Sequence, residues 1–246
     1  MMKIIPFFSQ RPWAGKRMQD FFPAAPFGTG ETWILSTLDD CESISEGKPL
    51  SEVLGKELPY IVKVIDTSAP LSVQVHPNDE WANKLEHSKG KSECWLILSA
   101  ETGAGVYLGL KPGIDRKTFE AAIKNAEDVS LLMNFQVVKK NDFISVPAGT
   151  IHAIGANVTL IEVQQASGIT YRLWDWGRTG RELHVDKGMM VSDFESRPEI
   201  RKAEDGVLFT HPDFEVRMND SEGDGWSISL EDFTLGEKKK PYLFVR

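Results

Sequence analysis

The sequence predicts an all-β protein of the sandwich or barrel type. Short runs of alternating or β-branched apolar residues recur along the chain, turns rich in Gly, Pro and Asn separate them, and few stretches have helical periodicity. Many short strands with few helices are typical of sandwiches and barrels. The chain has 246 residues, 41% of them hydrophobic, which is enough for one large β domain with a smaller annex.

The N-terminal half is expected to alternate between strands and short helical segments. Pro6 places the first strand at a sheet edge, because proline cannot donate a hydrogen bond inside a sheet. Ser51 is expected to begin one helical segment, and Asn78 to cap another that ends at Gly90. The predicted strands are 3–8, 31–36, 60–66, 71–76 and 91–98, and the helical segments are 15–22, 51–58 and 79–86.

The second half continues with strands around one well-defined helix. Asp115 is the predicted N-cap of a helix that runs to about Asn125, with Phe119, Ala122 and Ile123 on its apolar stripe. The strand 103–110 is expected to pair with 91–98 through a glycine-containing turn, and 158–165 is expected to form a hairpin with 170–176. Further strands are predicted at 135–138, 143–146, 207–210, 214–218, 226–230 and 242–245.

Composition excludes several classes of protein. The net charge of −8 leaves no basic surface of the kind that binds nucleic acid or an anionic membrane. The two cysteines, Cys41 and Cys94, are too few for a disulfide framework. No apolar stretch approaches the roughly 20 residues that span a bilayer, and the first residues lack the features of a secretory signal. A cytoplasmic location is therefore expected.

Four side chains form a candidate metal site. Gln74 and His76 are two residues apart on the polar face of an alternating strand, Glu93 lies on the next strand, and His152 follows the turn Pro147–Gly149. One amide, two imidazoles and one carboxylate suit zinc or another divalent first-row ion. The alternative for Gln74 and His76 is the solvated face of a half-buried strand.

A family resemblance is carried by several segments in order. Residues 141–152 resemble the second cupin motif, G-x5-P-x-G-x2-H, with Asn141 in place of the first glycine, and Gln74-Val75-His76 replaces the H-x-H of the first motif. Over Phe8 to Lys187 the chain resembles the type I mannose-6-phosphate isomerases in their short bacterial form. The segments that carry the resemblance are LSVQVHP, GKSECW, VPAGTIHAIG, LIEVQQ-S and TYRLWDWGR-GRELHVDK.

The resemblance implies an activity and assigns residues to it. It implies an enzyme that interconverts D-mannose 6-phosphate and D-fructose 6-phosphate through a cis-enediol or enediolate, with a small phosphorylated sugar as its partner. One zinc ion per chain would be bound by Gln74, His76, Glu93 and His152. Arg172 and Lys91 would be catalytic, with zinc and Arg172 stabilising charge on the sugar oxygens. Lys91, Glu162 and a metal-bound water stay open as the base.

Substrate-binding residues are harder to select, because charged loop residues are mostly solvated. A phosphate group should meet Lys, Arg or clustered backbone N–H groups. The candidates for the phosphate are Arg11, Lys16, Lys63 and Arg178. Trp13 and Trp174 are candidate walls of the sugar site, and Glu162 contacts either the substrate or a ligand histidine.

The expected architecture is a cupin (jelly-roll) β-barrel with a second, smaller cupin-like β module. Residues 1–195 would form the catalytic domain, with a short helical insertion near 113–127, and 196–246 a C-terminal β module that N-terminal strands complete. Two other functions are considered, a metal-dependent oxygenase and a non-enzymatic sugar-binding cupin. Gln74 in a ligand position argues against the first, and the presence of Glu93 and Arg172 argues against the second.

Overall fold

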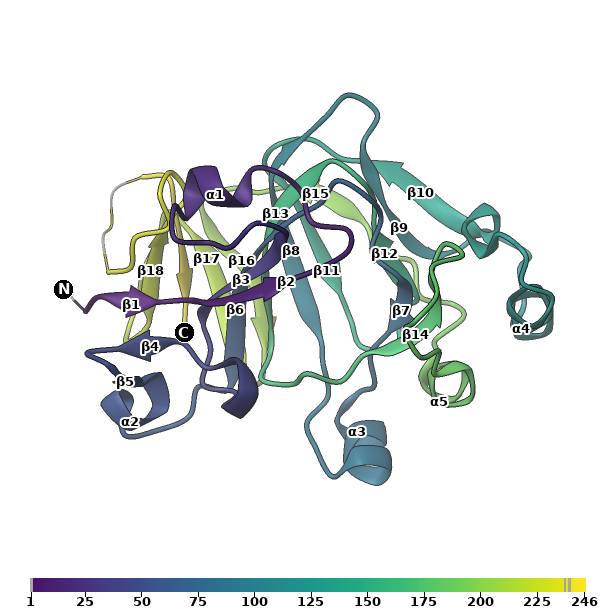
Figure 1. Cartoon of the computed structure of the whole chain (residues 1–246), viewed down its shortest axis with the longest axis horizontal. Helices are drawn as coiled ribbons and strands as arrows, with labels where there is room; N and C mark the ends of the chain where they lie inside the picture. Colours follow the sequence, from purple (N-terminus) through teal and green to yellow (C-terminus); the bar gives the residue numbers. More distant parts are fainter. Residues whose placement is uncertain (1, 237, 239) are drawn as a thin grey trace.

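Two large antiparallel sheets face each other across an apolar interior in the computed structural model, which describes residues 2–236, 238 and 240–246 (Figure 1). Side chains of both sheets fill this interior, among them Trp95 and Leu160 from one sheet and Leu108 and Ile154 from the other. The prediction of an all-β fold is confirmed. Over the described residues, the hydrogen-bonded ladders form two open sheets and do not close into one barrel.

The larger sheet has seven strands in the order β15-β11-β8-β13-β6-β3-β2. Its centre is β13, which pairs with β8 on one side and with β6 on the other. The strands are β2 (Phe7–Gln10), β3 (Thr29–Leu35), β6 (Tyr60–Asp66), β8 (Glu93–Ala100), β11 (Asp142–Val146), β13 (Val158–Gln165) and β15 (Ile200–Lys202). β13 and β6 are buried along their whole length, so their polar side chains are buried too.

The smaller sheet has five strands in the order β10-β9-β12-β7-β14. Its register decides the position of the site, because Gln74 on β7 lies opposite His152 on one neighbour and opposite Arg172 on the other. Side chains directly opposite each other on neighbouring strands are in contact range. The strands are β7 (Val73–Val75), β9 (Gly105–Leu110), β10 (Met133–Val137), β12 (His152–Ile154) and β14 (Tyr171–Trp174).

Both predicted strand pairings, 91–98 with 103–110 and 158–165 with 170–176, are wrong. β13 and β14 belong to different sheets, and so do β8 and β9. In each case the connection carries the chain from one sheet to the other, and the strand pairs with distant segments. Alternation predicts which face of a strand is buried, but it carries no information about the strand's partner.

The helices are short and lie outside the two sheets. They are α1 (Met18–Phe21), α2 (Leu50–Leu54), α3 (Asp79–Glu86), α4 (Arg116–Lys124) and α5 (Val185–Val191), with 3-10 turns η1 (Asp39–Cys41) and η2 (Val129–Leu132). Both predicted N-caps are confirmed: Asn78 accepts from the N–H of Trp81 and Asp115 from that of Thr118.

One predicted helix boundary is wrong, and one helix was not predicted. The predicted span 79–86 is confirmed for α3, but His87, whose φ is +51°, caps its C-terminus in place of Gly90. α2 begins at Leu50 and not at Ser51. Gly90 serves a close backbone approach instead: a Cβ there would lie 2.6 Å from the backbone of Asn78. α5 was missed because Gly188 within it disfavours a helix.

The remaining strands form two small sheets. The first consists of β16 (Gly206–His211), β17 (Phe214–Met218), β19 (Tyr242–Val245) and β18 (Trp226–Ser229) in that order, and the second of β1 (Ile4–Ile5), β4 (Ile44–Ser45) and β5 (Lys48–Pro49). Val216 and Leu243 of the first share a core with Val62 and Leu96 of the seven-stranded sheet. The division of the chain at residue 195 stays a prediction.

Pro6 separates β1 from β2, and β2 lies at the edge of its sheet, as proline requires. N-terminal aromatic residues also pack against the C-terminal segment, since the rings of Phe21 and Phe22 each lie 5.3 Å from that of Phe233.

Among the described residues, none of the helices has the length and apolar character needed to cross a membrane.

The backbone at Asn141 explains the departure from the glycine of the cupin motif. Its φ is +68°, the left-handed region that Asn tolerates better than most residues. We expect Asn141→Val to lower the free energy of unfolding by about 1–2 kcal/mol, because a branched Cβ clashes with the backbone in this conformation. Urea denaturation measures the change. Asn141→Gly is the matched control and should not be destabilised; equal stability of all three proteins would contradict this explanation.

Candidate active site

The four predicted metal ligands come together between the two sheets. Gln74 and His152 come from the five-stranded sheet, His76 directly follows β7, and Glu93 begins β8 of the opposite sheet. One ligand atom each of His76, Glu93 and His152 lies within 4.8 Å of the others. All three side chains are buried. Residues from distant parts of the chain therefore converge in one buried centre.

The distances show how closely this centre is packed. Nε2 of His76 lies 3.4 Å from Oε2 of Glu93, and Nε2 of His152 lies 3.5 Å from Oε1. The amide nitrogen of Gln74 lies 3.2 Å from Nε2 of His152. Gln74 is therefore in contact with His152, and its amide oxygen is one rotation of the amide group away from the same position.

Backbone carbonyl groups fix the orientation of both imidazoles. Nδ1 of His76 lies 2.9 Å from the carbonyl oxygen of Ile169, and Nδ1 of His152 lies 2.9 Å from that of Thr150. A carbonyl oxygen only accepts, so each Nδ1 carries the proton and donates it. Each Nε2 is thus left as a lone-pair donor that points to the centre, the tautomer that a metal-binding histidine needs.

Burial sets the charges of these ligands. It lowers the pKa of His152 to about 4 and that of His76 well below its usual value, helped at His76 by the charge of Lys91, so both rings are neutral at pH 7. Burial and the nearby carboxylate of Glu162 raise the pKa of Glu93 to about 7, against the opposing effect of Lys91. The indole N–H of Trp95 donates to Oε1 of Glu93 at 3.0 Å.

Two buried lysines surround Glu162. Nζ of Lys63 lies 3.0 Å and Nζ of Lys91 3.8 Å from Oε1 of Glu162, and Lys91 also donates to Glu93. Burial alone would raise the pKa of Glu162, but the two lysine charges outweigh it and lower that pKa to about 2. Burial likewise opposes the charge on Lys91, yet Glu162 and Glu93 raise its pKa. Both groups are therefore charged at neutral pH.

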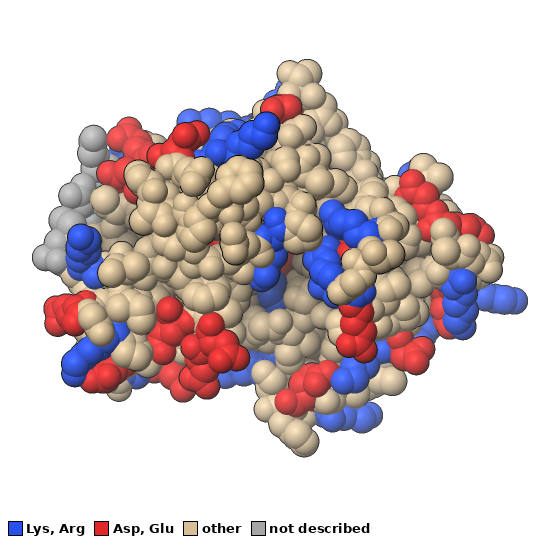
Figure 2. Space-filling view, in the orientation of Figure 1, with Lys and Arg blue, Asp and Glu red and all other residues tan. Residues whose placement is uncertain are grey.

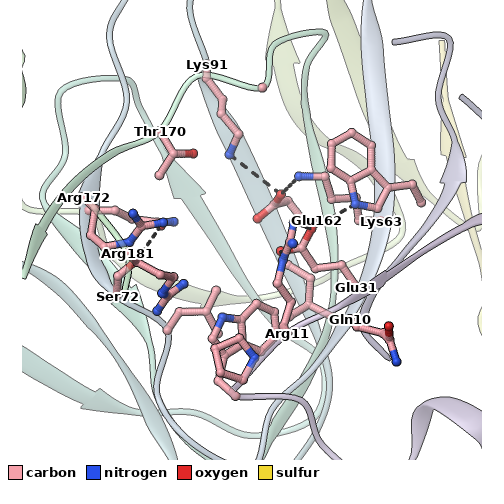
Figure 3. A pocket seen from close by; sticks show the side chains of 17 residues that line it. Gln10, Arg11, Glu31, Lys63, Ser72, Lys91, Glu162, Thr170, Arg172 and Arg181 are labelled. Carbon is pink, nitrogen blue, oxygen red and sulfur yellow. Dashed lines mark hydrogen bonds and ion pairs between the residues drawn. The ribbon is translucent and has the colours of Figure 1, made fainter. Parts of the chain in front are cut away.

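A cavity of about 540 Å³ opens next to this centre. Figure 2 shows a hollow in this face with Lys and Arg side chains at its rim. Gln74, Lys91 and Glu162 line the cavity, which connects it to the candidate metal centre, whereas His76, Glu93 and His152 are not among its lining residues. Figure 3 shows Lys91 and Glu162 in this cavity. The cavity is large enough for a monosaccharide derivative and lies within the usual range of volumes for ligand pockets.

The structure places the other predicted site residues in two groups. The first group lines the cavity and consists of Arg11, Trp13, Lys63, Glu162 and Arg172, whereas Lys16, Trp174 and Arg178 do not line it. Trp174 packs against Trp176 in a tilted arrangement, with 4.7 Å between ring centroids. Arg178 pairs with Asp175 and donates to the carbonyl oxygen of Pro70 at 2.8 Å.

Arg172 is held by the backbone at the cavity wall. Its Nη1 donates to the carbonyl oxygen of Glu182 at 2.7 Å, and its buried Nε has no hydrogen-bond partner within the part of the chain that the structure describes. Arg181 also lines the cavity and was missed by sequence reasoning. The only signal in the sequence was its place in the family-like segment 170–187, which holds two further arginines.

Known proteins share both the sequence and this fold. Residues 31–94 match the model of the phosphomannose isomerase type I catalytic domain. Mannose-6-phosphate isomerase ManA of Bacillus subtilis is 36% identical over 217 residues, covering 79% of this chain and 68% of that protein. Mannose-6-phosphate isomerase of Streptococcus mutans is 32% identical over 95% of this chain and 80% of that protein. The chain belongs to the type I mannose-6-phosphate isomerase family.

Solved structures support the fold of this family member. A crystal structure of mannose 6-phosphate isomerase from Bacillus subtilis has a TM-score of 0.78 at 24% identity, covering 99% of this chain and 92% of that one. A crystal structure of mannose 6-phosphate isomerase bound with zinc and yttrium has a TM-score of 0.68 at 15% identity, covering 100% of this chain and 93% of that one. The predicted family, its cupin-type β fold and its class of enzyme are therefore confirmed.

Proposed function

We propose that this mannose-6-phosphate isomerase family member interconverts D-mannose 6-phosphate and D-fructose 6-phosphate and requires zinc. The observation that carries the proposal is the convergence of Gln74, His76, Glu93 and His152 beside a cavity lined with cationic side chains. Family membership supplies the reaction class. It also disfavours the two alternatives, an oxygenase and a non-enzymatic sugar-binding cupin. The cytoplasmic location and the absence of nucleic-acid partners stay predictions.

The chemistry of the donor set supports zinc. His76 and His152 are neutral and turn an unprotonated Nε2 to the centre, and Glu93 supplies a carboxylate between them. Two imidazoles and a carboxylate are a common donor set for catalytic zinc. Gln74 would complete the set through its amide oxygen. A related structure was determined with bound zinc. When bound, such an ion acts as a Lewis acid that stabilises negative charge on oxygen.

The residues of this chain would perform the remaining chemistry. Isomerisation moves a proton between C1 and C2 and builds negative charge on the adjacent sugar oxygens. Arg172 is the register partner of Gln74 on the neighbouring strand and lines the cavity, so its guanidinium is placed to stabilise this charge. Lys91 is kept protonated by Glu162 and Glu93 and would donate a proton to a sugar oxygen.

Glu162 is the protein group that best fits the base among those that border the cavity. Its carboxylate is ionised, whereas Lys91 is protonated and cannot accept a proton. Lys63 and Lys91 hold Glu162 from two sides and fix its position. The low pKa of Glu162 makes it a weak base. The proton could reach Glu162 directly or through a water molecule in the cavity, because either path keeps the base within hydrogen-bond reach of the substrate.

Turnover tests the proposed function directly. We expect the zinc-loaded protein to convert mannose 6-phosphate to fructose 6-phosphate, the chelated protein to be inactive, and added zinc to restore the rate, because the ion stabilises charge at the reacting oxygens. A coupled assay that detects fructose 6-phosphate measures the rate. Absence of turnover by protein that contains zinc would contradict the proposal.

Removing the guanidinium of Arg172 tests its role. We expect Arg172→Ala to keep the metal and to lower kcat by about 100-fold or more, because it removes a charge that is needed only as the enediolate forms. Steady-state kinetics and metal analysis measure both quantities. Arg197→Ala, an exposed arginine outside the cavity, is the matched control. A near-normal kcat of Arg172→Ala would show that this residue has another role.

A further inference from the structure

The cavity carries positive charge on a chain whose net charge is −8. Five cationic and two acidic side chains line it, namely Arg11, Lys63, Lys91, Arg172, Arg181, Glu31 and Glu162. Lys63 and Lys91 both contact Glu162, and Lys91 also contacts Glu93. Both lysines are buried against carboxylates, so the accessible positive charge of the cavity lies with its arginines, of which Arg11 is 37% and Arg181 25% exposed.

Arg181 is held in place by a buried carboxylate. Its Nε donates to Oδ2 of Asp175 at 2.8 Å and its Nη2 donates to Oδ1 at 2.5 Å. This two-point contact fixes the plane of the guanidinium. Nη1 of Arg181 has no hydrogen-bond partner within residues 2–236, 238 and 240–246, so this end of the group is available to a ligand.

Arg11 has the same arrangement on another element. Its Nε and Nη2 donate to the two carboxylate oxygens of Glu31 at 3.1 and 3.4 Å, and the indole N–H of Trp33 donates to Glu31 at 2.9 Å. As for Arg181, the described part of the chain provides no partner for Nη1 of Arg11. Two arginines that line one cavity are therefore each fixed by a carboxylate at the same edge and left unpaired at the same nitrogen.

Arg172 completes the group. Figure 3 shows Arg11, Arg172 and Arg181 around the cavity that Lys91 and Glu162 also border. Burial, followed by the charges of Arg181, Arg11 and Arg178, lowers the pKa of Arg172 despite the opposing effect of Asp175. The positive charges therefore repel one another, and an anion bound among them would relieve this repulsion.

We propose that Arg11 and Arg181 bind the phosphate group of the substrate, with Glu31 and Asp175 as their positioning residues. The inference deepens the proposed function and rests on it for the identity of the substrate. A phosphate oxygen accepts hydrogen bonds from several guanidinium groups, and fixed guanidinium groups bind phosphate best. Arg11 was also a candidate for the phosphate from the sequence, whereas Arg178, another candidate, does not line the cavity and donates to Asp175 and to the carbonyl oxygen of Pro70.

Neutral substitution of either arginine tests the subsite. We expect Arg11→Gln and Arg181→Gln each to raise KM for mannose 6-phosphate by about ten-fold or more while kcat changes much less, because phosphate contacts are made equally in the ground and transition states. Lys16→Gln is the matched control, since it removes an exposed charge nearby that does not line the cavity. An unchanged KM in both arginine variants would overturn the proposal.

A binding measurement separates failure of the subsite from failure of the proposed function. Inorganic phosphate is titrated calorimetrically into the metal-loaded wild type, both arginine variants and Lys16→Gln, and needs no turnover. We expect the wild type and the control to bind phosphate. Both arginine variants should bind it about ten-fold or more weakly. Equal binding by all four proteins overturns the subsite, whereas loss of binding in the variants without turnover by the wild type overturns only the proposed reaction.

The positioning role of Asp175 has its own test. We expect Asp175→Asn to raise KM for mannose 6-phosphate and to weaken the binding of inorganic phosphate, as Arg181→Gln does. The effect on kcat should be smaller. Thermal unfolding of the same variant reports whether the loop is destabilised. A fall in kcat at unchanged KM, or unchanged phosphate binding, would show that Asp175 has only a structural role.

Discussion

The buried carboxylate of Glu93 is the constraint on which the site depends. An ionised group without solvent is strongly disfavoured unless charges and hydrogen bonds compensate it. Here the side chains of Lys91 and Trp95 donate to it, and two neutral imidazoles turn their lone pairs to the same region. Nζ of Lys91 lies 3.1 Å from Nε2 of His76, and the amide nitrogen of Gln74 lies 3.2 Å from Nε2 of His152. A bound metal ion would replace these donors as the partner of both lone pairs. The two-sheet fold creates this arrangement, because Glu93 comes from one sheet and His152 from the other.

Ion pairs continue from this centre to the wall of the cavity. Glu162 is shared by two lysines, Arg11 is paired with Glu31, and Arg181 is paired with Asp175. In every pair the carboxylate fixes the cation. Such positioning is what catalysis and phosphate recognition require, because a group that is already oriented needs no reorganisation when the substrate binds. The proposed ion, the reacting carbons and the phosphate would thus contact three different sets of side chains. Each of these sets is held in position by its own hydrogen bonds or ion pairs.

Sequence reasoning succeeded where a local rule applied. Strand alternation put Gln74 and His76 on one face, and both helix N-caps followed from side-chain chemistry. It failed where contacts with distant segments of the chain determine the local structure or the direction of a side chain. Gly188 looked unsuited to a helix, yet a Cβ there would lie 2.5 Å from the side chain of Leu173. Arg178 and Arg181 have the same chemistry in one short segment and both donate to Asp175, yet only Arg181 lines the cavity, and no local rule distinguishes them.

The account depends most on one ion being bound by these four side chains. Crystals of the zinc-loaded protein, measured on both sides of the zinc absorption edge, would locate the ion by anomalous scattering. The account predicts one strong peak about 2.0–2.3 Å from Nε2 of His76, Nε2 of His152 and a carboxylate oxygen of Glu93, with the amide oxygen of Gln74 as the remaining protein ligand. A peak elsewhere, or a filled site with Glu93 outside the coordination sphere, would contradict it.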